Sequence, residues 1–245
     1  MKCAEKVNKG LHNVAVKAAI PHTLPVMAGY LFLGASYGIL MSTRGFSFIY
    51  PMITSTFVFA GSLEFALAGI LIGAFNPIEA LLLSVMINAR HIFYGISMLD
   101  KYRGLGKKKL YLIYALTDET FSVNYSAEIP EGVDRGLFYF YTSLFDHLYW
   151  VVGATVGGIF GSLLPVGIRG FDFAMTAMFA VILLEQILSS RKNIPSVIIG
   201  VSLSLFALVI FGSDGFIIPS MLLMLLALAV FRRPIEHAEK GEGDV

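Results

Sequence analysis

The stretch LLLSVMINARHIFYGIS, residues 81–97, carries an asparagine, an arginine and a histidine in the middle of an apolar run. The surrounding segment, 78–99, is long enough to cross a bilayer, which takes about 20 residues of helix. An arginine at the centre of such a helix costs about 2.5 to 3.5 kcal/mol on insertion scales. We therefore expect Asn88, Arg90 and His91 to face a protein interior, a partner charge or a water-filled cavity. The alternative is an arginine that snorkels to the membrane surface beside a satisfied core histidine.

Composition places the chain in a membrane. Of its 245 residues, 56% are hydrophobic and only 14% are charged, whereas a soluble domain carries about 25% charged residues. The net charge of +1 argues against nucleic-acid binding, which needs a basic face. The single cysteine, Cys3, leaves no disulfide framework or cysteine metal site within one chain. We expect one membrane domain at 18–231, between cytoplasmic tails at 1–17 and 232–245.

Eight apolar segments follow one another along this domain. They lie at about 18–41, 49–75, 78–99, 110–127, 137–164, 171–190, 194–211 and 216–231. Short loops rich in lysine and arginine tend to stay cytoplasmic, which puts the loop 101–109 and Arg191 inside and the acidic loop 128–134 outside. Eight simple crossings conflict with this placement. The conflict disappears if 49–75 and 171–190 enter the membrane and return, which is allowed where protein buries the backbone or the backbone lines a cavity.

Two short motifs recur in the same order. Residues 34–38 (GASYG) are echoed by 153–157 (GATVG), and residues 44–48 (RGFSF) by 169–173 (RGFDF). With the two re-entrant segments, the halves at about 18–100 and 137–211 would cross the membrane in opposite directions. The prediction is an all-α polytopic membrane protein with about six spanning helices, two re-entrant segments and an inverted repeat, an architecture found in many secondary transporters. The alternative is a chance match in a chain rich in glycine and phenylalanine.

Ionisable and small residues inside the apolar segments form a candidate pathway for substrate and ions. Glycine at 61 can break a helix, so that backbone amides from Ser62 onward could face a substrate carboxylate. Glu64 could couple transport to an ion, bind an ammonium group, or simply neutralise Arg90. Asp118 and the next residue point about 100° apart on a helix, so the two acids cannot face one neighbour. The complete candidate set is Gly61, Ser62, Glu64, Asn88, Arg90, His91, Asp118, Glu119, Asp146 and Glu185.

Nothing in the sequence points to catalysis. It contains no H-E-x-x-H and no Walker A motif, so we expect no enzyme activity, no metal, no cofactor and no ATP-driven transport by this chain. An ion gradient is then the default energy source. A desolvated carboxylate such as Asp118 is our candidate proton carrier, because His91 lies beside Arg90, whose charge opposes a second proton.

Five motifs together resemble the AzlC/YgaZ family of branched-chain amino acid exporters. They are AGSLEF (60–65), NARHIFYG (88–95), TDETF (117–121), LFDHLYWVVGATVGGIFG (144–161) and RGFDFAMTAMF (169–179). The resemblance covers residues from about 25 to 191. It implies the large subunit of a two-component exporter in the cytoplasmic membrane, with a small membrane subunit of the AzlD/YgaH type as partner. It also implies valine, leucine, isoleucine or methionine as substrate.

Two other functions are compatible with the same features. A channel for small solutes could be built from the same broken helices, and saturable, gradient-driven counterflow would separate it from a transporter. A non-transporting scaffold subunit is the second alternative. Buried charges argue against a scaffold, because it gains little from them.

Overall fold

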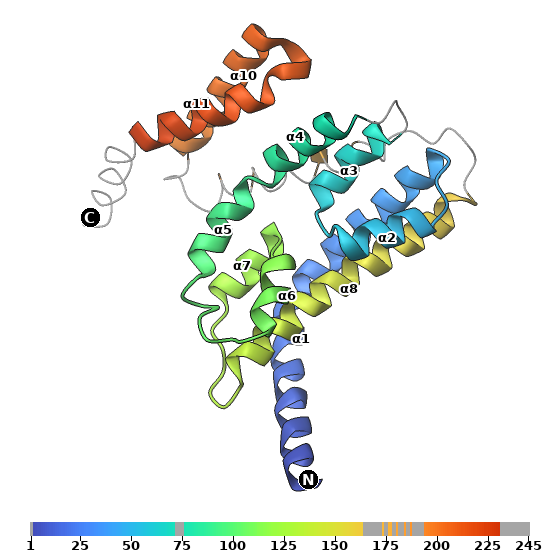
Figure 1. Ribbon diagram of the computed structural model, residues 1–245, viewed down its shortest axis with the longest axis vertical. Helices are drawn as coiled ribbons and strands as arrows, with labels where there is room; N and C mark the ends of the chain where they lie inside the picture. Colours follow the sequence, from blue (N-terminus) through green and yellow to red (C-terminus); the bar gives the residue numbers. More distant parts are fainter. Residues whose placement is uncertain are drawn as a thin grey trace. The chain divides into compact units, whose positions relative to one another are not determined.

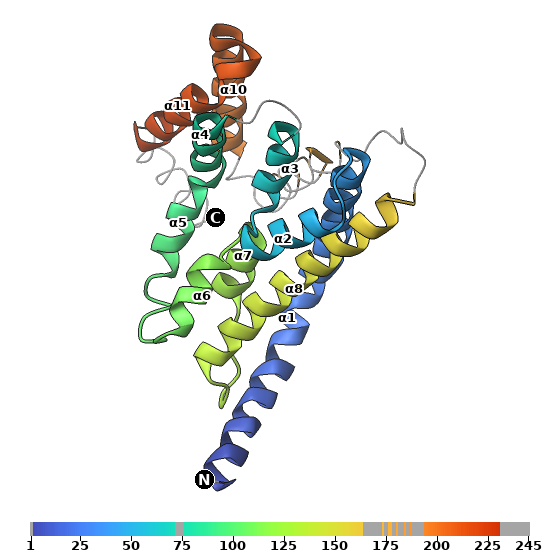
Figure 2. The same ribbon diagram turned by 45° about the vertical axis from the view of Figure 1, so that its right-hand side comes forward.

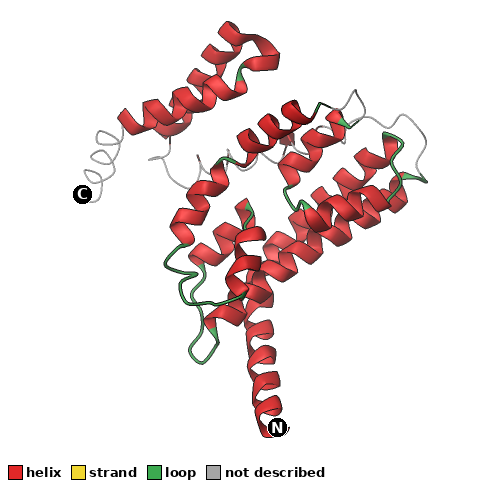
Figure 3. Cartoon of the chain, viewed as in Figure 1, coloured by secondary structure: helices red, strands yellow, loops and turns green. Residues whose placement is uncertain are grey.

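The computed structural model describes residues 2–71, 76–163 and 194–230, together with isolated positions between 173 and 187. Every element in these residues is an α-helix (Figure 3). The helices fall into two compact units, one within 1–175 and one within 176–245. Two helical stretches of the described residues, Gly10–Thr43 and Ala80–Met98, are long and apolar enough to span a membrane by length and composition.

Two long helices, α1 (Lys2–Thr43) and α8 (Arg135–Gly161), form the frame of the first unit and lie side by side (Figure 1, Figure 2). The shorter helices of this unit are α2 (Ile49–Phe57), α3 (Gly61–Ile70), α4 (Pro77–Asn88), α5 (Arg90–Met98), α6 (Lys108–Tyr114) and α7 (Asp118–Ser126). Helices α4 and α5 together correspond to the predicted apolar segment 78–99, and only Ala89 separates them.

Glycines bring the backbones of α1 and α8 into direct contact. A Cβ atom added to Gly34 would lie 2.8 Å from the carbonyl oxygen of Trp150, and one added to Gly153 would lie 2.9 Å from that of Leu31. Small residues on both helices are what allow such an approach in a membrane. Along the interface, residues 31, 35 and 39 of α1 meet residues 153, 157 and 161 of α8 in that order. The two helices therefore run parallel.

This parallel pairing corrects the predicted inverted repeat. An inverted repeat needs equivalent segments that cross in opposite directions, whereas the echoed motifs at 34–38 and 153–157 run the same way. Their contacts are also mutual, because each glycine faces the residue three positions before the opposite glycine. Such reciprocity gives this contact between α1 and α8 a local two-fold symmetry. The prediction of inversion came from counting crossings, which says nothing about which helices touch.

The segment 49–75 does not form one continuous helix. Helices α2 and α3 are separated by a tip at 58–60, where Phe59 has a positive φ of 45°. Helix α2 starts near the C-terminal end of α8, since a Cβ added to Gly158 would lie 3.0 Å from Phe48. Helix α3 then returns toward the C-terminal end of α1, where Ala68 packs in one apolar cluster with Met41. The chain therefore reverses between α2 and α3, and entry of this segment into the membrane stays a prediction.

The segment 110–127, which we expected to cross, is a second broken hairpin. Helix α6 ends at Tyr114 and α7 begins at Asp118. The end of α7 comes back to the loop that precedes α6, because Lys101 Nζ donates to the carbonyl oxygen of Asn124 at 3.4 Å. Arg135 at the start of α8 donates to the carbonyl oxygen of the residue before Lys101, at 2.9 Å. This hairpin therefore starts and ends at the N-terminal end of α8.

The second hairpin also corrects the placement of the acidic loop 128–134. Lys108 Nζ of the basic loop lies 3.6 Å from Asp134 Oδ1. The acidic and basic loops thus lie on one side of the unit, not on opposite sides. The physical reason is the reversal between α6 and α7, which brings the chain back to the side it left.

Apolar clusters occupy both ends of the first unit. Toward the N-terminal ends of α1 and α8, Tyr102, Leu112 and Phe138 are buried together. Toward the C-terminal ends, Tyr37 and Met41 form the core of a second cluster. The layer between the two clusters contains the two hairpin tips, 58–60 and 115–117, and polar side chains that include Arg90 and Asp146. We call it the polar layer.

Within residues 194–230, the second unit contains α10 (Ile194–Gly215) and α11 (Ile217–Val230), which pack against each other. Helix α10 is kinked at Gly212, where φ is 72°. The predicted re-entrant segment 171–190 lies outside the described residues, apart from isolated positions.

Candidate functional site

The two hairpin tips meet each other in the polar layer. The hydroxyl of Tyr114, at the end of α6, donates to the carbonyl oxygen of Thr56 near the end of α2, at 2.6 Å. The ring of Phe59, at the tip between α2 and α3, lies 4.2 Å from the ring of His147 on α8. The hydroxyl of Tyr111 on α6 lies 3.0 Å from Nδ1 of the same histidine, so both hairpins contact the same stretch of α8. A single polar layer results from elements far apart in the sequence.

Arg90 joins the two hairpins. Its Nη2 atom donates to Ser62 Oγ at 2.8 Å and forms an ion pair with Asp118 Oδ2 at 2.9 Å. Ser62 lies in the first turn of α3 and Asp118 in the first turn of α7. The guanidinium therefore spans two helix N-termini, and the carboxylate at one of them also suits the positive end of the helix dipole. The expected carboxylate partner of Arg90 is confirmed, and the alternative of a snorkelling arginine is wrong.

Tyr30 of α1 holds the N-terminus of α7. Its hydroxyl lies 2.6 Å from Thr117 Oγ1 and donates to Glu119 Oε2 at 2.8 Å. Thr117 is the N-cap of α7, and its Oγ1 accepts from the backbone N–H of Thr120 at 3.3 Å. Because Glu119 turns to Tyr30 while the preceding Asp118 turns to the arginine, the prediction that the two acids face different neighbours is confirmed.

Asp146 of α8 extends this network into the core. It is fully buried, and its Oδ2 accepts from Thr120 Oγ1 at 2.9 Å. The threonine hydroxyl in turn lies 3.0 Å from Thr117 Oγ1. A continuous run of hydrogen bonds therefore links α1, α7 and α8 through their polar side chains. The other carboxylate oxygen of Asp146, Oδ1, has no hydrogen-bond partner among the described residues.

Glu64 attaches the first hairpin to α8. Its side chain is 1% exposed, and its Oε1 accepts from the backbone N–H of Ala60 and from Trp150 Nε1, both at 3.1 Å. The indole covers the start of α3 so closely that a Cβ added to Gly61 would lie 2.8 Å from it. The interpretation of Glu64 as the neutralising partner of Arg90 is wrong, because that partner is an acid of the second hairpin.

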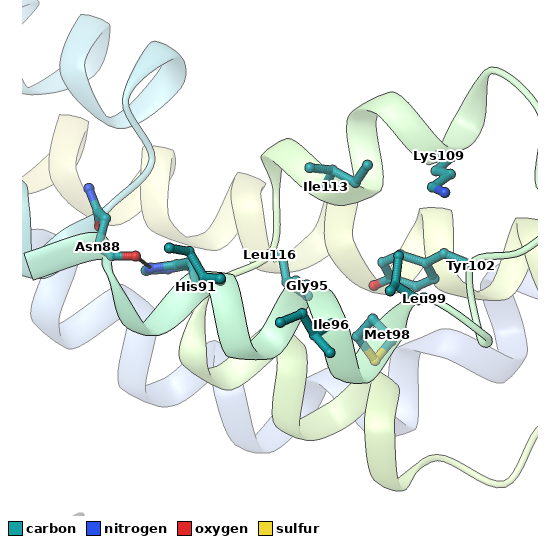
Figure 4. Close-up of a pocket in the computed structure, with 11 residues that line it drawn as sticks. Asn88, His91, Gly95, Ile96, Met98, Leu99, Tyr102, Lys109, Ile113 and Leu116 are labelled. Carbon is teal, nitrogen blue, oxygen red and sulfur yellow. Dashed lines mark hydrogen bonds between the residues drawn. The ribbon is translucent and has the colours of Figure 1, made fainter. Parts of the chain in front are cut away.

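Asn88 and His91 line a pocket on another side of the second hairpin (Figure 4). The pocket has a volume of about 440 Å³ and lies between α5 and α6. His91 Nδ1 lies 3.2 Å from the carbonyl oxygen of Asn88. The rest of the lining is mostly aliphatic, including Ile96 and Ile113, with Lys109 near the opposite end.

Comparison with known proteins identifies the family. The model of the family described as AzlC protein matches residues 25–164, which contain both hairpins, Arg90 and the whole of α8. The chain belongs to the AzlC family. It is 55% identical to the branched-chain amino acid transport protein AzlC of Bacillus subtilis over 225 residues, which cover 92% of this chain and 88% of that protein.

Other AzlC relatives are named as membrane proteins. An uncharacterized membrane protein of Haemophilus influenzae is 46% identical over 88% of both chains. The inner membrane protein YgaZ of Escherichia coli is 25% identical over 70% of this chain and 71% of its own length. No solved structure matches the chain. The predicted family and the membrane location are confirmed by these matches, and AzlC is not an enzyme family.

The AzlC fold brings most of the predicted site residues to one layer. Ser62, Arg90 and Asp118 are in direct contact, and Glu119 and Asp146 belong to the adjoining network. Gly61 and Glu64 lie against the indole of α8, whereas Asn88 and His91 line the separate pocket. Glu185 lies outside the described residues. Their part in transport stays a prediction.

Four further residues of the layer were not among the predicted site residues. They are Tyr30, Thr117, Thr120 and Trp150. The threonine before two acids was a recognisable N-cap pattern. The tyrosine and the tryptophan lie in apolar runs and carried no local signal.

Proposed function

We propose that this chain is the large subunit of a proton-driven secondary transporter that exports valine, leucine, isoleucine or methionine across the cytoplasmic membrane. Its partner would be a small membrane subunit of the AzlD/YgaH type. The observation that carries this proposal is the 55% identity, over nearly the whole chain, to a protein named as a branched-chain amino acid transport protein.

The proposed topology follows from the two hairpins. Helices α1 and α8 and the α4–α5 pair cross the membrane, with the N-terminus and the loops around Lys101 and Asp134 in the cytoplasm. The α2–α3 hairpin enters from outside and the α6–α7 hairpin from inside. Broken helices whose N-termini meet inside the membrane are a recurrent way for transporters to present backbone amides and polar side chains to a substrate. The domain predicted at 18–231 would hold these elements together with α10 and α11.

In this proposal the polar layer binds the two charged groups of an amino acid. Arg90 and the first turn of α3 would receive the carboxylate, because both present N–H donors. The ammonium group would lie toward Glu119 and Asp146. The aliphatic side chain would be accepted by apolar surface such as that of the pocket between α5 and α6.

The ion pair argues against our first candidate for the proton carrier. Asp118 is the charge partner of Arg90 and part of the bridge between the hairpins. Protonation would leave the arginine without that partner and would open the bridge. We therefore assign Asp118 a structural and gating role, and proton binding to another acid.

Counterflow in proteoliposomes that contain both subunits tests the proposal. We expect saturable uptake of labelled leucine into vesicles loaded with unlabelled leucine, and none with the small subunit alone. Arg90→Gln should reduce the rate at least about tenfold, since loss of a charge-assisted hydrogen bond is worth roughly 1.5 to 3 kcal/mol. The matched control is Arg103→Gln, because Arg103 is exposed in the basic loop.

The alternative functions give different results in the same vesicles. Uptake that never saturates and shows no counterflow would indicate a channel. Transport that is unchanged when this chain is left out would indicate a scaffold. The direction is tested in cells fed with a leucine-containing dipeptide, where expression of both subunits should speed the release of free leucine.

A further inference from the structure

We propose that Glu64 is the group that binds and releases the driving proton, an inference that rests on the proposed function. Its side chain is 1% exposed, and its two hydrogen bonds both go to Oε1. The second oxygen, Oε2, is buried and has no hydrogen-bond partner among the described residues. A buried carboxylate oxygen without a donor is costly when the group is charged, and much less so when that oxygen carries a proton.

The groups around Glu64 do not supply a compensating positive charge in the described part of the chain. Tyr37 of α1 is hydrogen-bonded to Thr54, and Tyr114 of α6 to a backbone carbonyl. On α8, His147 is hydrogen-bonded to Tyr111 of α6.

The remaining charged groups near the hairpin are engaged elsewhere. Asp146 is itself an acid and is hydrogen-bonded to a threonine of α7. In the described part of the chain, Arg90 contacts α3 at Ser62. Ser62 lies two positions before Glu64 and therefore about 200° from it around the helix. Its ion pair is with Asp118. Glu64 thus differs from Asp118 in having only neutral donors.

The position of Glu64 explains how one proton would change the shape of the site. Its Oε1 connects the tip of the first hairpin, through the N–H of Ala60, to the indole of Trp150 on α8. With the proton bound, the neutral side chain is compatible with this buried, closed position. Without the proton, the charge favours a position in which water reaches the tip. Proton binding and hairpin closure are thereby linked, and each changes the other by the same free energy.

The variant Glu64→Gln separates this role from folding. Glutamine keeps the oxygen that accepts from Ala60 and Trp150, so the closed arrangement is retained, but it cannot exchange a proton. In proteoliposomes of the two-subunit complex, the wild type should concentrate leucine several-fold when a pH gradient is imposed. Glu64→Gln should keep leucine counterflow and lose all pH-driven accumulation. Glu131→Gln, which changes an exposed loop acid, should behave as wild type.

A second measurement reads the proton itself. Infrared difference spectra of the purified complex between high and low pH should show the C=O band of a protonated buried carboxyl group. The component of this band that belongs to Glu64 should be lost in Glu64→Gln, and the spectrum of Glu131→Gln should match the wild type. This readout needs no transport, so it still decides the case if Glu64→Gln loses counterflow.

The outcomes are distinguishable. Accumulation of leucine by Glu64→Gln in response to the pH gradient would overturn the assignment, and so would C=O bands that the substitution leaves unchanged. If the wild type carries no leucine, the proposed function fails, while the infrared result still shows whether Glu64 takes up a proton. If the wild type carries leucine without regard to the pH gradient, proton coupling fails but amino acid transport stands.

Discussion

Arg90 forms an ion pair with Asp118 at 2.9 Å while it donates to Ser62 at 2.8 Å. One guanidinium therefore closes the gap between the N-termini of α3 and α7. The arginine itself comes from the first turn of α5, on the far side of the break at Ala89. Three interrupted helices thus depend on one side chain, and movement of either hairpin must break at least one of its bonds.

The first prediction concerns this pair. Arg90→Gln leaves Asp118 without its charge partner, and we expect the free energy of unfolding to fall by about 2 kcal/mol. Fully buried pairs typically lose about 3 to 5 kcal/mol, but these side chains are 33% and 21% exposed. The melting temperature of the complex in detergent measures the effect. The double variant Arg90→Gln/Asp118→Asn should melt above the single Arg90→Gln. A double variant that melts no higher would mean that the pair is not the stabilising contact.

The second prediction tests the parallel contact of α1 and α8. A methyl group on Gly38 would overlap the backbone of Ala154, so Gly38→Ala should destabilise the unit by about 1 to 3 kcal/mol, the usual range for overpacking. Gly29→Ala is the matched control, because its Cβ would meet no atom within 4 Å. Thermal stability by fluorescence-detected size exclusion compares the two. Equal melting of both variants would contradict the close glycine contact.

The third prediction concerns the cap of α7. Thr117→Ala removes the oxygen that accepts from Thr120 N–H and contacts the hydroxyl of Tyr30. N-cap substitutions typically cost about 0.5 to 2 kcal/mol, and a lower melting temperature should follow. Thr117→Ser keeps the hydroxyl and should restore most of the difference. If alanine and serine behave alike, the hydroxyl plays no part in stability.

The fourth prediction concerns topology. In a Cys3→Ser background, single cysteines at Ser47 and Asn76 flank the first hairpin and should both react with an impermeant maleimide from outside the cell. Cysteines at Lys107 and Glu131 should react only after the membrane is permeabilised. All four positions are exposed. Labelling of Glu131→Cys from outside would mean that α6–α7 crosses, and labelling of only one of the first pair would mean that α2–α3 crosses.

Sequence patterns predicted the parts of the site that are governed by local cost. The run of apolar residues around Arg90 required a compensating acid, and the structure supplies Asp118. The charge of the loops predicted that 49–75 and 171–190 both return. The chain reverses between α2 and α3, whereas 171–190 lies outside the described residues apart from isolated positions. These inferences could be made from the sequence because a buried charge in a membrane is costly in free energy whichever residue compensates it.

The relations between distant segments could not be read in the same way. Charge counting limits the number of crossings but does not say which segment reverses, so the return of α6–α7 was assigned to other segments. Glycine spacing predicts close helix contact but is compatible with either direction, and the direction of α1 against α8 was predicted wrongly. The contact of Glu64 with Trp150 joins residues whose local patterns are unrelated.

By itself, the sequence determined that this chain is a helical membrane protein with polar groups that must be satisfied inside it. Hydropathy and hydrogen bonding within each helix are local properties, so they can be predicted from the sequence of each segment. Only the tertiary structure decided that Asp118 pairs with Arg90, that Glu64 accepts from two neutral donors, and that α1 and α8 run parallel. Those outcomes depend on contacts between segments far apart in the sequence, such as the glycine faces of α1 and α8 and the hairpin tips that pack against α8. The local sequence of one segment does not specify which other segment it will contact.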